Sequence, residues 1–320
     1  MKITRRQFAI AAAMPTFPSF AAAFPERPMT FICPWPAGGT ADMTMRALCL
    51  AASKDLGQPI AVENKAGASG MLGLKTMLSA KPDGYTVGQI PISVTRFSQL
   101  GSVAIDPTKD ITYLARTSGQ VFGIAVPANS RFKTLQDLVR EAKANPGKVS
   151  YAHAGVGGAT HVGMEEFAMT AGASFLHVPF KGGADALQAV LGGHVEVLAD
   201  SSSWATHVEA GRLRLLATWG EQRVNRFKEV PTLKDAGYNV VVDAPNGVGA
   251  PKGVDPAITA RLRQAFRAAA LSAEFKAACD KIDAPVLYLD GGDYEKYAAQ
   301  VYAKETMLIE RLKLKELLKN

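Results

Sequence analysis

The spacing of apolar residues divides the chain into short apolar runs and longer stretches with apolar positions three or four residues apart. The short runs predict β-strands and the longer stretches predict helices. In the first part of the chain, strands are expected at residues 29–33, 60–62 and 85–92, and helices at 42–52 and 71–78. Strands that alternate with helices are typical of βαβ units, in which a helix connects two parallel strands.

The middle of the chain repeats this alternation. A helix is expected at residues 134–144, where Thr134 and Asp137 form a variant of the capping box. Strands are expected at residues 149–153, 175–180, 195–199 and 213–218. Helices between these strands are expected to end at Gly192–Gly193 and Gly211, because glycine readily adopts the left-handed conformation that follows a helix.

The pattern changes after residue 251. Asp255 and Pro256 open one predicted helix, and Asp293 opens a long charged helix that is expected to run through Leu318. The simplest arrangement is two α/β lobes followed by a helical C-terminal part.

Composition and charge narrow the class of protein. Apolar residues make up 48% of the chain and charged residues 20%, which is typical of a folded globular protein. Lys and Arg outnumber Asp and Glu by 36 to 29; without the three basic residues of the first 23 positions the balance is 33 to 29, or +4. Because no basic cluster is interleaved with aromatic residues, nucleic acid is not expected as a partner.

Residues 1–23 have the pattern of an export signal, with a basic start, a short apolar stretch at residues 8–14 and three alanines before Phe24. Residues 4–8 (TRRQF) resemble the twin-arginine export motif, and a general secretory signal that contains two arginines is the alternative. Either signal would place the mature chain in the periplasm, beginning near Phe24. No later segment has 18 consecutive apolar residues, so the mature protein is expected to be soluble.

The same glycine-containing turn occurs once in each half of the chain. Residues 33–42 (CPWPAGGTAD) and residues 153–161 (HAGVGGATH) each run from a predicted strand through a glycine pair into a predicted helix. Glycine lets the backbone approach a ligand closely, and the first turn of a helix has unpaired N–H groups at the positive end of its dipole. Each turn could bind a carboxylate or phosphate, or be an ordinary strand-to-helix connection. Neither has the sequence of a nucleotide-binding loop.

A family resemblance extends from these turns over nearly all of the chain after the export signal. The first turn contains the pattern Pro-aromatic-x-x-Gly-Gly-x-x-Asp at residues 34–42, and further matching segments follow at 62–65, 82–86, 144–148, 178–183, 191–193, 210–213 and 230–237. In this order and spacing, the chain resembles the periplasmic solute receptors of tripartite tricarboxylate transporters, the Bug family.

The resemblance implies a type II periplasmic binding-protein fold, an α/β architecture in which two lobes are joined by crossing strands around a ligand cleft. Lobe 1 is expected at residues 24–122 and 248–320, including the C-terminal helices, and lobe 2 at 123–247. The crossing strands are expected near residues 122–127 and 242–251.

The resemblance also implies that backbone N–H groups of the two turns hold a small carboxylate, partly through water. The matching residues are Gly38, Gly39, Thr40 and Ala41 in the first turn and Gly157, Gly158 and Ala159 in the second. Gly158 stands where the family usually has serine or threonine, so one hydroxyl contact is missing. No metal and no cofactor are expected.

Side chains near the turns are further candidates for ligand contact. Trp35 is expected to cover a ligand with its indole ring, and a core position is the alternative. Ser93 and Arg96 follow the third predicted strand; Arg96 either meets a second acidic group of the ligand or is solvated at the surface.

Other side chains have structural alternatives. His161 is expected to brace the second turn by hydrogen bonding, in preference to binding a metal together with Glu165. Asp200 and the adjacent Ser201 follow a predicted strand, where Asp200 either faces the cleft and selects donor groups on the ligand or caps a helix. Lys181 is either a cation in the cleft or a solvated loop residue.

The three cysteines are too few for a disulfide framework, although Cys49 and Cys279 could pair. Cys33 lies at the mouth of the expected cleft, where a buried thiol is favoured over a nucleophile because the preceding strand is apolar.

The function expected from these features is a monomeric binding protein without catalytic activity. It would deliver a small carboxylate to integral-membrane transporter subunits. A receptor for a sensor kinase is an alternative, and so is an exported enzyme on the same fold. The sequence has no Gly-x-Ser-x-Gly, His-Glu-x-x-His or paired-cysteine motif that would support an enzyme.

Overall fold

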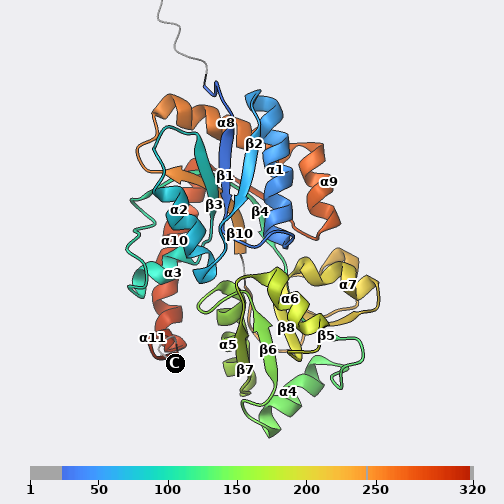
Figure 1. Ribbon diagram of the computed structural model, residues 1–320. Coiled ribbons are helices and arrows are strands. Elements are labelled where there is room, and N and C mark those ends of the chain that lie inside the picture. The colour runs from blue at the N-terminus through green and yellow to red at the C-terminus, as the bar shows by residue number, and fades with distance from the viewer. Residues whose placement is uncertain (1–23, 243, 318–320) are drawn as a thin grey trace, which may run out of the picture.

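Two separate β-sheets organise the chain, each within its own α/β lobe (Figure 1). The computed structural model describes residues 24–242 and 244–317. The expected export signal lies outside these residues. Within them, no helix combines the length and the apolar character needed to cross a membrane.

The elements of lobe 1 come from both ends of the chain. They are β1 (Met29–Cys33), α1 (Thr40–Leu56), β2 (Ile60–Asn64), η1 (Ala68–Gly70), α2 (Met71–Leu78), β3 (Thr86–Ile90), α3 (Val94–Gln99), β4 (Ile111–Gln120), β10 (Ala244–Pro251), α8 (Pro256–Leu271), α9 (Ala273–Lys281), β11 (Val286–Asp290), α10 (Gly291–Arg311) and α11 (Leu314–Leu317). The sheet order is β11-β4-β10-β3-β1-β2, in which β1 is parallel to β2 and β3.

Lobe 2 is continuous in sequence. Its elements are β5 (Phe122–Pro127), α4 (Leu135–Ala144), β6 (Ser150–His153), α5 (Ala159–Ala171), β7 (Leu176–Pro179), α6 (Gly183–Leu191), β8 (Val197–Ser201), η2 (Ser202–Trp204), α7 (Ala205–Glu209), β9 (Leu213–Thr218) and η3 (Asn225–Phe227). The sheet order is β7-β6-β8-β5-β9, in which β6 is parallel to β7 and β8.

Helices cover both faces of each sheet, as expected for parallel strands joined by crossover helices (Figure 1). In lobe 1, α1, α8 and α9 pack on one face, where Met45, Leu48 and Phe266 are fully buried. The other face is covered by α2, α3 and α10. In lobe 2, α4 and α5 contribute to one apolar cluster, while α6 and α7 contribute to another. The expected α/β fold with two lobes is confirmed.

The chain passes from one sheet to the other at Val121 and again between Val242 and Ala244. Phe122 pairs with Ser201 in the second sheet, and Ala244 pairs with Gln120 in the first. The chain therefore crosses between the sheets within a few residues of the lobe boundaries that were expected after residues 122 and 247. A residue joins one sheet or the other because of its pairing with distant strands, and the local sequence pattern does not indicate these partners.

Most of the predicted helix ends are confirmed. The capping box of α4 is complete, because the Thr134 hydroxyl accepts from the Asp137 N–H (3.1 Å) and the Asp137 carboxylate accepts from the Thr134 N–H (3.0 Å). Asp255 caps α8. Gly193 and Gly211 adopt the expected left-handed conformation.

The C-terminal helix differs from its prediction. Helix α10 begins at Gly291 with Asp290 as its N-cap, and Asp293 lies in its first turn, where its N–H donates to the Asp290 carboxylate. The helix ends at Arg311, and Lys313, with φ of 49°, separates it from α11. The expected end at Leu318 lies outside the described residues.

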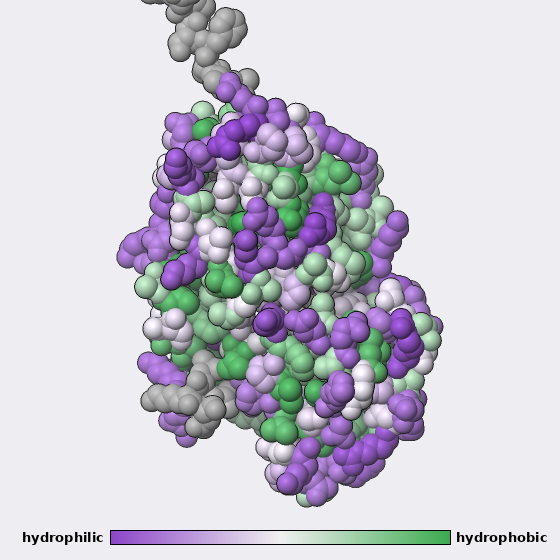
Figure 2. Space-filling view, in the orientation of Figure 1, coloured by the Kyte–Doolittle hydropathy of each residue, from purple (hydrophilic) through white to green (hydrophobic). Residues whose placement is uncertain are grey.

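Helix α10 and the segment after it contact both lobes. Ile309 and Leu314 pack with Val162 of α5, and Arg311 pairs with Glu166 of the same helix. In the ribbon diagram, α10 runs from lobe 1 down along the side of the molecule toward lobe 2 (Figure 1). The space-filling view shows the lobes in contact, with hydrophobic residues scattered in separate spots among polar ones (Figure 2).

Candidate functional site

A cavity of about 70 Å³ lies between the two lobes. Its walls include several residues that the sequence analysis selected: Trp35, Gly39, Thr40, Ala41, Ser93, Gly158, Ala159, Asp200 and Ser201. The cavity is also lined by residues that were not expected there from the sequence, among them Gln89, Gln120, Phe122, Gly183 and Ala184. Gly38, Arg96, Gly157 and His161 were also expected at the site, but they do not line the cavity.

Three helices begin at this cavity. Residues of the first turns of α1 (Thr40, Ala41), α5 (Ala159, Thr160) and α6 (Gly183, Ala184) line it. The N-cap residues of all three helices are glycines without a side chain to bond the first N–H groups. These N–H groups therefore remain available to an anion at the positive ends of three helix dipoles.

The third helix start was not identified as an anion-binding turn from the sequence. Its signal was present, because Lys181, Gly182 and Gly183 follow a predicted strand and precede a helix, as in the other two turns. Lys181 itself is exposed and does not line the cavity. Among the described residues, no lysine or arginine side chain lines the cavity, so its positive potential comes from backbone groups.

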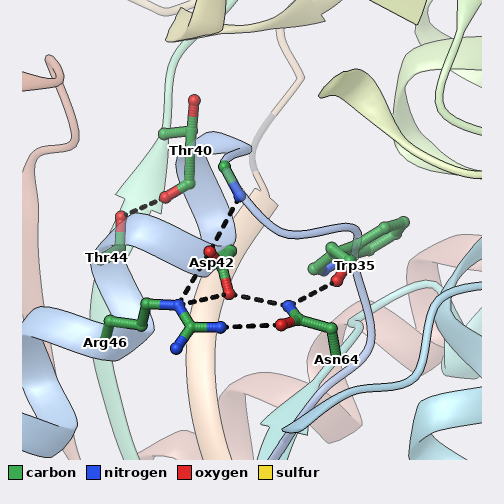
Figure 3. Close-up of polar contacts among 7 residues, drawn as sticks. Trp35, Thr40, Asp42, Thr44, Arg46 and Asn64 are labelled. Carbon is green, nitrogen blue, oxygen red and sulfur yellow. Dashed lines mark hydrogen bonds and ion pairs between the residues drawn. The ribbon is translucent and has the colours of Figure 1, made fainter. Parts of the chain in front are cut away.

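Asp42 braces the first turn from within lobe 1 (Figure 3). Its carboxylate accepts from the Gly38 N–H (2.9 Å), from Arg46 Nε (3.0 Å) and from Asn64 Nδ2 (2.7 Å). Asn64 also donates to the Trp35 carbonyl oxygen (2.9 Å) and accepts from Arg46 Nη2 (2.8 Å). The Gly38 N–H is thereby occupied by Asp42 and is not available to a ligand, contrary to its predicted role.

Burial alone would raise the pKa of Asp42, but the hydrogen bonds from Arg46, Asn64 and Gly38 outweigh this effect and lower its pKa. The carboxylate therefore stays ionised. As an acceptor-only group it holds all three donors, which fixes the shape of the turn on which Gly39 and Thr40 lie.

His161 braces the second turn as predicted, since its Nδ1 accepts from the Gly157 N–H (3.1 Å). The Gly157 N–H is thus occupied, and the residues of this segment that line the cavity are Ala154, Gly158, Ala159 and Thr160. Glu165 does not join His161; its carboxylate accepts from the Tyr151 hydroxyl (2.7 Å).

His161 belongs to a cluster with His153 and His177, whose ring nitrogens lie within 4.8 Å of one another. Backbone N–H groups donate to Nδ1 of His153 and of His161, so Nε2 of each neutral ring carries the proton. A metal ion at the centre would have to displace these protons and move them onto nitrogens that already face N–H donors. This chemistry favours a structural role for the cluster.

Burial lowers the pKa of both His153 and His161 to about 3, and the neighbouring histidines add to this effect. For His161, the positive charge of Arg96 contributes as well. Both rings are therefore neutral at ordinary pH.

Arg96 was expected either to meet an acidic group of the ligand or to be solvated, and the structure shows neither arrangement. It is buried, and its Nε and Nη2 form a bidentate pair with the Glu305 carboxylate of α10 (2.8 Å each). Its Nη1 donates to the Gly157 carbonyl oxygen (2.8 Å). Glu305 lies 209 residues away in sequence, so no local pattern could indicate this partner.

Asp200 lies in β8 with its carboxyl group buried at the cavity. Burial raises its pKa to about 6, against hydrogen bonds from Ser203 and Ser201 that lower it. The short helix η2 that follows has Ser201 at its N-cap, so the helix-cap alternative for Asp200 does not hold. A carboxyl group in this state can accept hydrogen bonds from donors on a ligand.

Three further polar atoms at the cavity have no hydrogen-bond partner among the described residues. They are Nε1 of Trp35, Oγ1 of Thr40 and Oε1 of Gln89. Gln89 is held in place by its other end, since Nε2 donates to Oδ1 of Asn246 (2.8 Å). Buried polar atoms are usually satisfied, so these three are exceptions among the described residues of the cavity wall.

The cysteines take no part in the site. Cys33, Cys49 and Cys279 are free and buried, so the pairing of Cys49 with Cys279 considered from the sequence is wrong. Burial raises the pKa of the Cys33 thiol to about 12, which fits a packed thiol and not a nucleophile.

Comparison with known proteins agrees with this architecture. A relative in Cupriavidus necator, a UPF0065 protein in the gbd 5′ region, is 44% identical over 95% of this chain and 92% of its own length. The structure of the periplasmic binding protein BugD has a TM-score of 0.85 at 25% identity and covers 91% of this chain and 99% of its own. MatC from Rhodopseudomonas palustris with bound malate shares the fold, with a TM-score of 0.80 at 24% identity, covering 91% of this chain and all of its own.

The family comparison covers most of the molecule. The sequence model of the tripartite tricarboxylate transporter family receptor matches residues 44–314, which include all of lobe 2 and the part of lobe 1 that follows the start of α1, helix α10 among it. The chain therefore belongs to the tripartite tricarboxylate transporter receptor family, to which the Bug proteins are related.

Proposed function

We propose that this protein captures a small carboxylate in the cavity between its lobes and passes it, chemically unchanged, to the integral-membrane subunits of a tripartite transporter. The convergence of three helix N-termini on one cavity supports the carboxylate as ligand. Each helix N-terminus carries roughly half a positive charge, and its free N–H groups match the oxygens of a carboxylate. The malate bound in MatC is an example of such an anion in a protein of this fold.

The other residues that line the cavity indicate which groups the rest of the ligand carries. Ile92, Phe122 and Trp35 offer apolar surface, while Asp200 and Oε1 of Gln89 accept hydrogen bonds. A hydroxyl or amino group beside the carboxylate would satisfy these acceptors. About 70 Å³ is small beside the roughly 300–1,000 Å³ of common small-molecule pockets, so the cavity favours a compact molecule.

Export to the periplasm and delivery to a transporter are part of the same proposal. The family that the chain belongs to is described as the receptor of such a transporter. The basic and apolar pattern of residues 1–23 supports export by either of the two routes considered above. The described cysteines are all buried and none lines the cavity, which argues against thiol catalysis there.

A thermal-shift screen followed by calorimetry tests the proposal. The probes are acetate, lactate, malate, citrate and adipate, with lactamide as a neutral control for lactate. A bound carboxylate present at 100 times its Kd should stabilise the protein by about 2.7 kcal/mol. We expect the compact hydroxy acids to bind more tightly than adipate, and lactamide not to bind.

Mass spectrometry of the recovered carboxylate completes this test. The bound molecule should have the same mass before and after incubation with the protein. A changed mass would contradict the binding-protein function, and equal binding of lactamide and lactate would contradict anion recognition.

A further inference from the structure

Two carbonyl groups of the second turn, those of Val156 and Gly157, each have a hydrogen-bond partner in lobe 1. The Ser69 hydroxyl donates to the Val156 carbonyl oxygen (2.6 Å), and Nη1 of Arg96 donates to the Gly157 carbonyl oxygen (2.8 Å). Ser69 belongs to η1 and Arg96 to α3, so both donors come from the lobe opposite the turn.

The N–H groups of the same peptide units point back into lobe 2. The Gly157 N–H donates to His161 Nδ1 (3.1 Å), and the Gly158 N–H donates to the Gly155 carbonyl oxygen (3.2 Å). A peptide unit is planar and carries its C=O and N–H on opposite sides. The unit between residues 156 and 157 is therefore fixed at both ends, and so is the unit between residues 157 and 158.

Glu305 sets the orientation of Arg96 independently of the turn. Both residues are buried, and two nitrogens of the guanidinium bind the carboxylate side-on. Bidentate pairing of this kind fixes the plane of the guanidinium. With the plane fixed, the third nitrogen, Nη1, is held in position to donate to the Gly157 carbonyl oxygen.

The loop that carries Ser69 is strained where it meets the turn. Ala68 and Ser69 have φ of 46° and 52°, in the left-handed region that residues other than glycine rarely adopt. Such strain persists only where the surroundings hold it, and it often marks ligand clamps. Facing Ser69 is Gly155, where a Cβ would lie 2.6 Å from the Ser69 hydroxyl oxygen.

We propose that Ser69 and Arg96 are positioning residues for ligand binding, which fix the two peptide units of the second turn from lobe 1 and so give this turn its binding conformation only when the lobes are closed. The proposal rests on the proposed function. Glycines at 155, 157 and 158 let the turn change conformation more readily once the two donors are withdrawn. Each turn is braced from its own lobe, the first by Asp42 and the second by His161, but among the described residues only the second also accepts hydrogen bonds from the opposite lobe.

The first arm of the test uses the protein with and without saturating malate, because the two donors reach the turn only in closed molecules and a bound ligand favours the closed state. Hydrogen exchange at the Gly157 and Gly158 amides is measured by NMR in the wild type, in Ser69→Ala and in Arg96→Lys. Lysine keeps a positive charge beside Glu305 but has only one nitrogen, so it cannot bind Glu305 with two nitrogens and also donate to the Gly157 carbonyl oxygen. We expect exchange at these two amides to be at least fivefold faster in both variants.

Controls separate a local effect from general destabilisation. Amides of the lobe 2 core, such as those of Ala152 and Leu198, should exchange at wild-type rates in both variants. Ser79→Ala and Arg261→Lys remove comparable contacts within lobe 1, to the Lys75 carbonyl oxygen and to Asp55, and should leave the turn unchanged.

The second arm measures binding kinetics with lactate, malate and citrate. A ligand enters the open protein, so the association rate constant should stay within twofold of the wild type. The dissociation rate constant should rise at least fivefold in Ser69→Ala and Arg96→Lys, because the closed complex loses part of its second turn. The control variants should match the wild type in both constants.

The two arms distinguish the two proposals. Unchanged exchange at the Gly157 and Gly158 amides would overturn the positioning role, whatever the binding result. Faster exchange in a protein whose wild type binds none of the carboxylates would support the positioning of the turn and contradict the proposed function. Equal dissociation rate constants in a wild type and variants that bind would overturn the role in ligand binding.

Discussion

Gly39 has no side chain, and this leaves the first N–H groups of α1 accessible from the cavity. Its φ of −75° suits any residue, and a Cβ at this position would meet only the Pro36 carbonyl oxygen at 3.7 Å, an ordinary contact. An alanine therefore fits the fold. What it would change is the space in front of the α1 N–H groups, which Gly39 leaves open to the cavity.

We predict that Gly39→Ala weakens carboxylate binding at least tenfold, or about 1.4 kcal/mol, while the protein stays folded. Calorimetry measures the affinity, and circular dichroism checks the fold. Gly292→Ala is the control, because this glycine likewise lies at the start of a lobe 1 helix and has room for a Cβ, but it does not line the cavity. Wild-type affinity in Gly39→Ala would remove the first turn from the ligand site.

The buried histidines make stability depend on pH. In the folded protein the pKa of His153 and of His161 is about 3, against 6.5 for an unperturbed histidine. Between these values the unfolded chain binds protons that the folded chain does not. Each histidine should therefore lower the free energy of unfolding by about 1.4 kcal/mol for each pH unit below 6.5.

Asp200 acts in the opposite direction. Its pKa is about 6 in the folded protein against an ordinary 3.8, so the folded chain binds the extra proton between these values. Its stabilising contribution is complete below pH 3.8 and is lost as the pH rises through 6. Two histidines outweigh one carboxyl group, so stability should fall on acidification from pH 6 to pH 4.

We predict that His153→Asn makes this dependence shallower by about 1.4 kcal/mol per pH unit, because one titrating ring is removed while an oxygen remains to accept the Gly155 N–H. Urea unfolding at pH 4.5, 5.5 and 6.5 measures the slope. His194→Asn, at an exposed histidine, should keep the wild-type slope. A slope unchanged in His153→Asn would show that His153 takes up a proton in the folded protein.

At the scale of elements, the start of α1 depends on a brace from the neighbouring strand. Asp42 in the first turn of α1 and Asn64 at the end of β2 are joined by a hydrogen bond, and Arg46 of α1 contacts both. Because β1 and β2 are adjacent parallel strands, this network ties the turn after β1 to the end of its neighbour (Figure 3).

We predict that Asp42→Asn lowers the free energy of unfolding by about 1–3 kcal/mol, since a buried acceptor of charged and backbone donors is weakened. It should also weaken carboxylate binding, because the turn loses its shape. Urea unfolding and calorimetry measure the two effects. Asp137→Asn, in the exposed capping box of α4, is the control and should leave binding unchanged. Binding equal to the wild type in Asp42→Asn would mean that the turn holds its shape without this carboxylate.

The whole molecule is closed around the cavity in this structure. Hydrogen bonds between the two lobes join Ser69 to Val156 and Arg96 to Gly157. Gly182 of lobe 2 lies so close to Pro36 of lobe 1 that a Cβ at this glycine would overlap the proline ring. The end of α10 adds apolar contacts and the pair between Arg311 and Glu166. Binding a ligand inside such a cavity requires that the lobes separate and close again.

We predict that a bound carboxylate shifts the lobes toward the closed state. Spin labels at Lys75→Cys in lobe 1 and Lys181→Cys in lobe 2 report the distance between the lobes, and both positions are exposed. The three native thiols are buried and should not react with the label. The distance distribution should narrow toward its short end when the carboxylate is added. A distribution that does not change would mean that the free protein is already closed.

The sequence alone determined the features that depend on residues close together in the chain. The spacing of apolar residues located the strands and most helices, because a helix or strand buries one face at a fixed period. Thr134 with Asp137 and Asp255 with Pro256 marked helix starts, because a cap is completed within one turn. The glycine pairs at 38–39 and 157–158 located two of the three helix N-termini at the cavity for the same reason.

Only the tertiary structure decided which residues meet across the fold. Arg96 binds Glu305, Asp42 accepts a hydrogen bond from Asn64, and Ser69 donates to the Val156 carbonyl oxygen, and each pair joins segments that are distant in the sequence. The third helix start, at Gly183, joins the site because β8 brings Asp200 against it. Such partners are set by how the sheets and helices pack, and a charged or polar side chain gains its partner only when burial removes it from water.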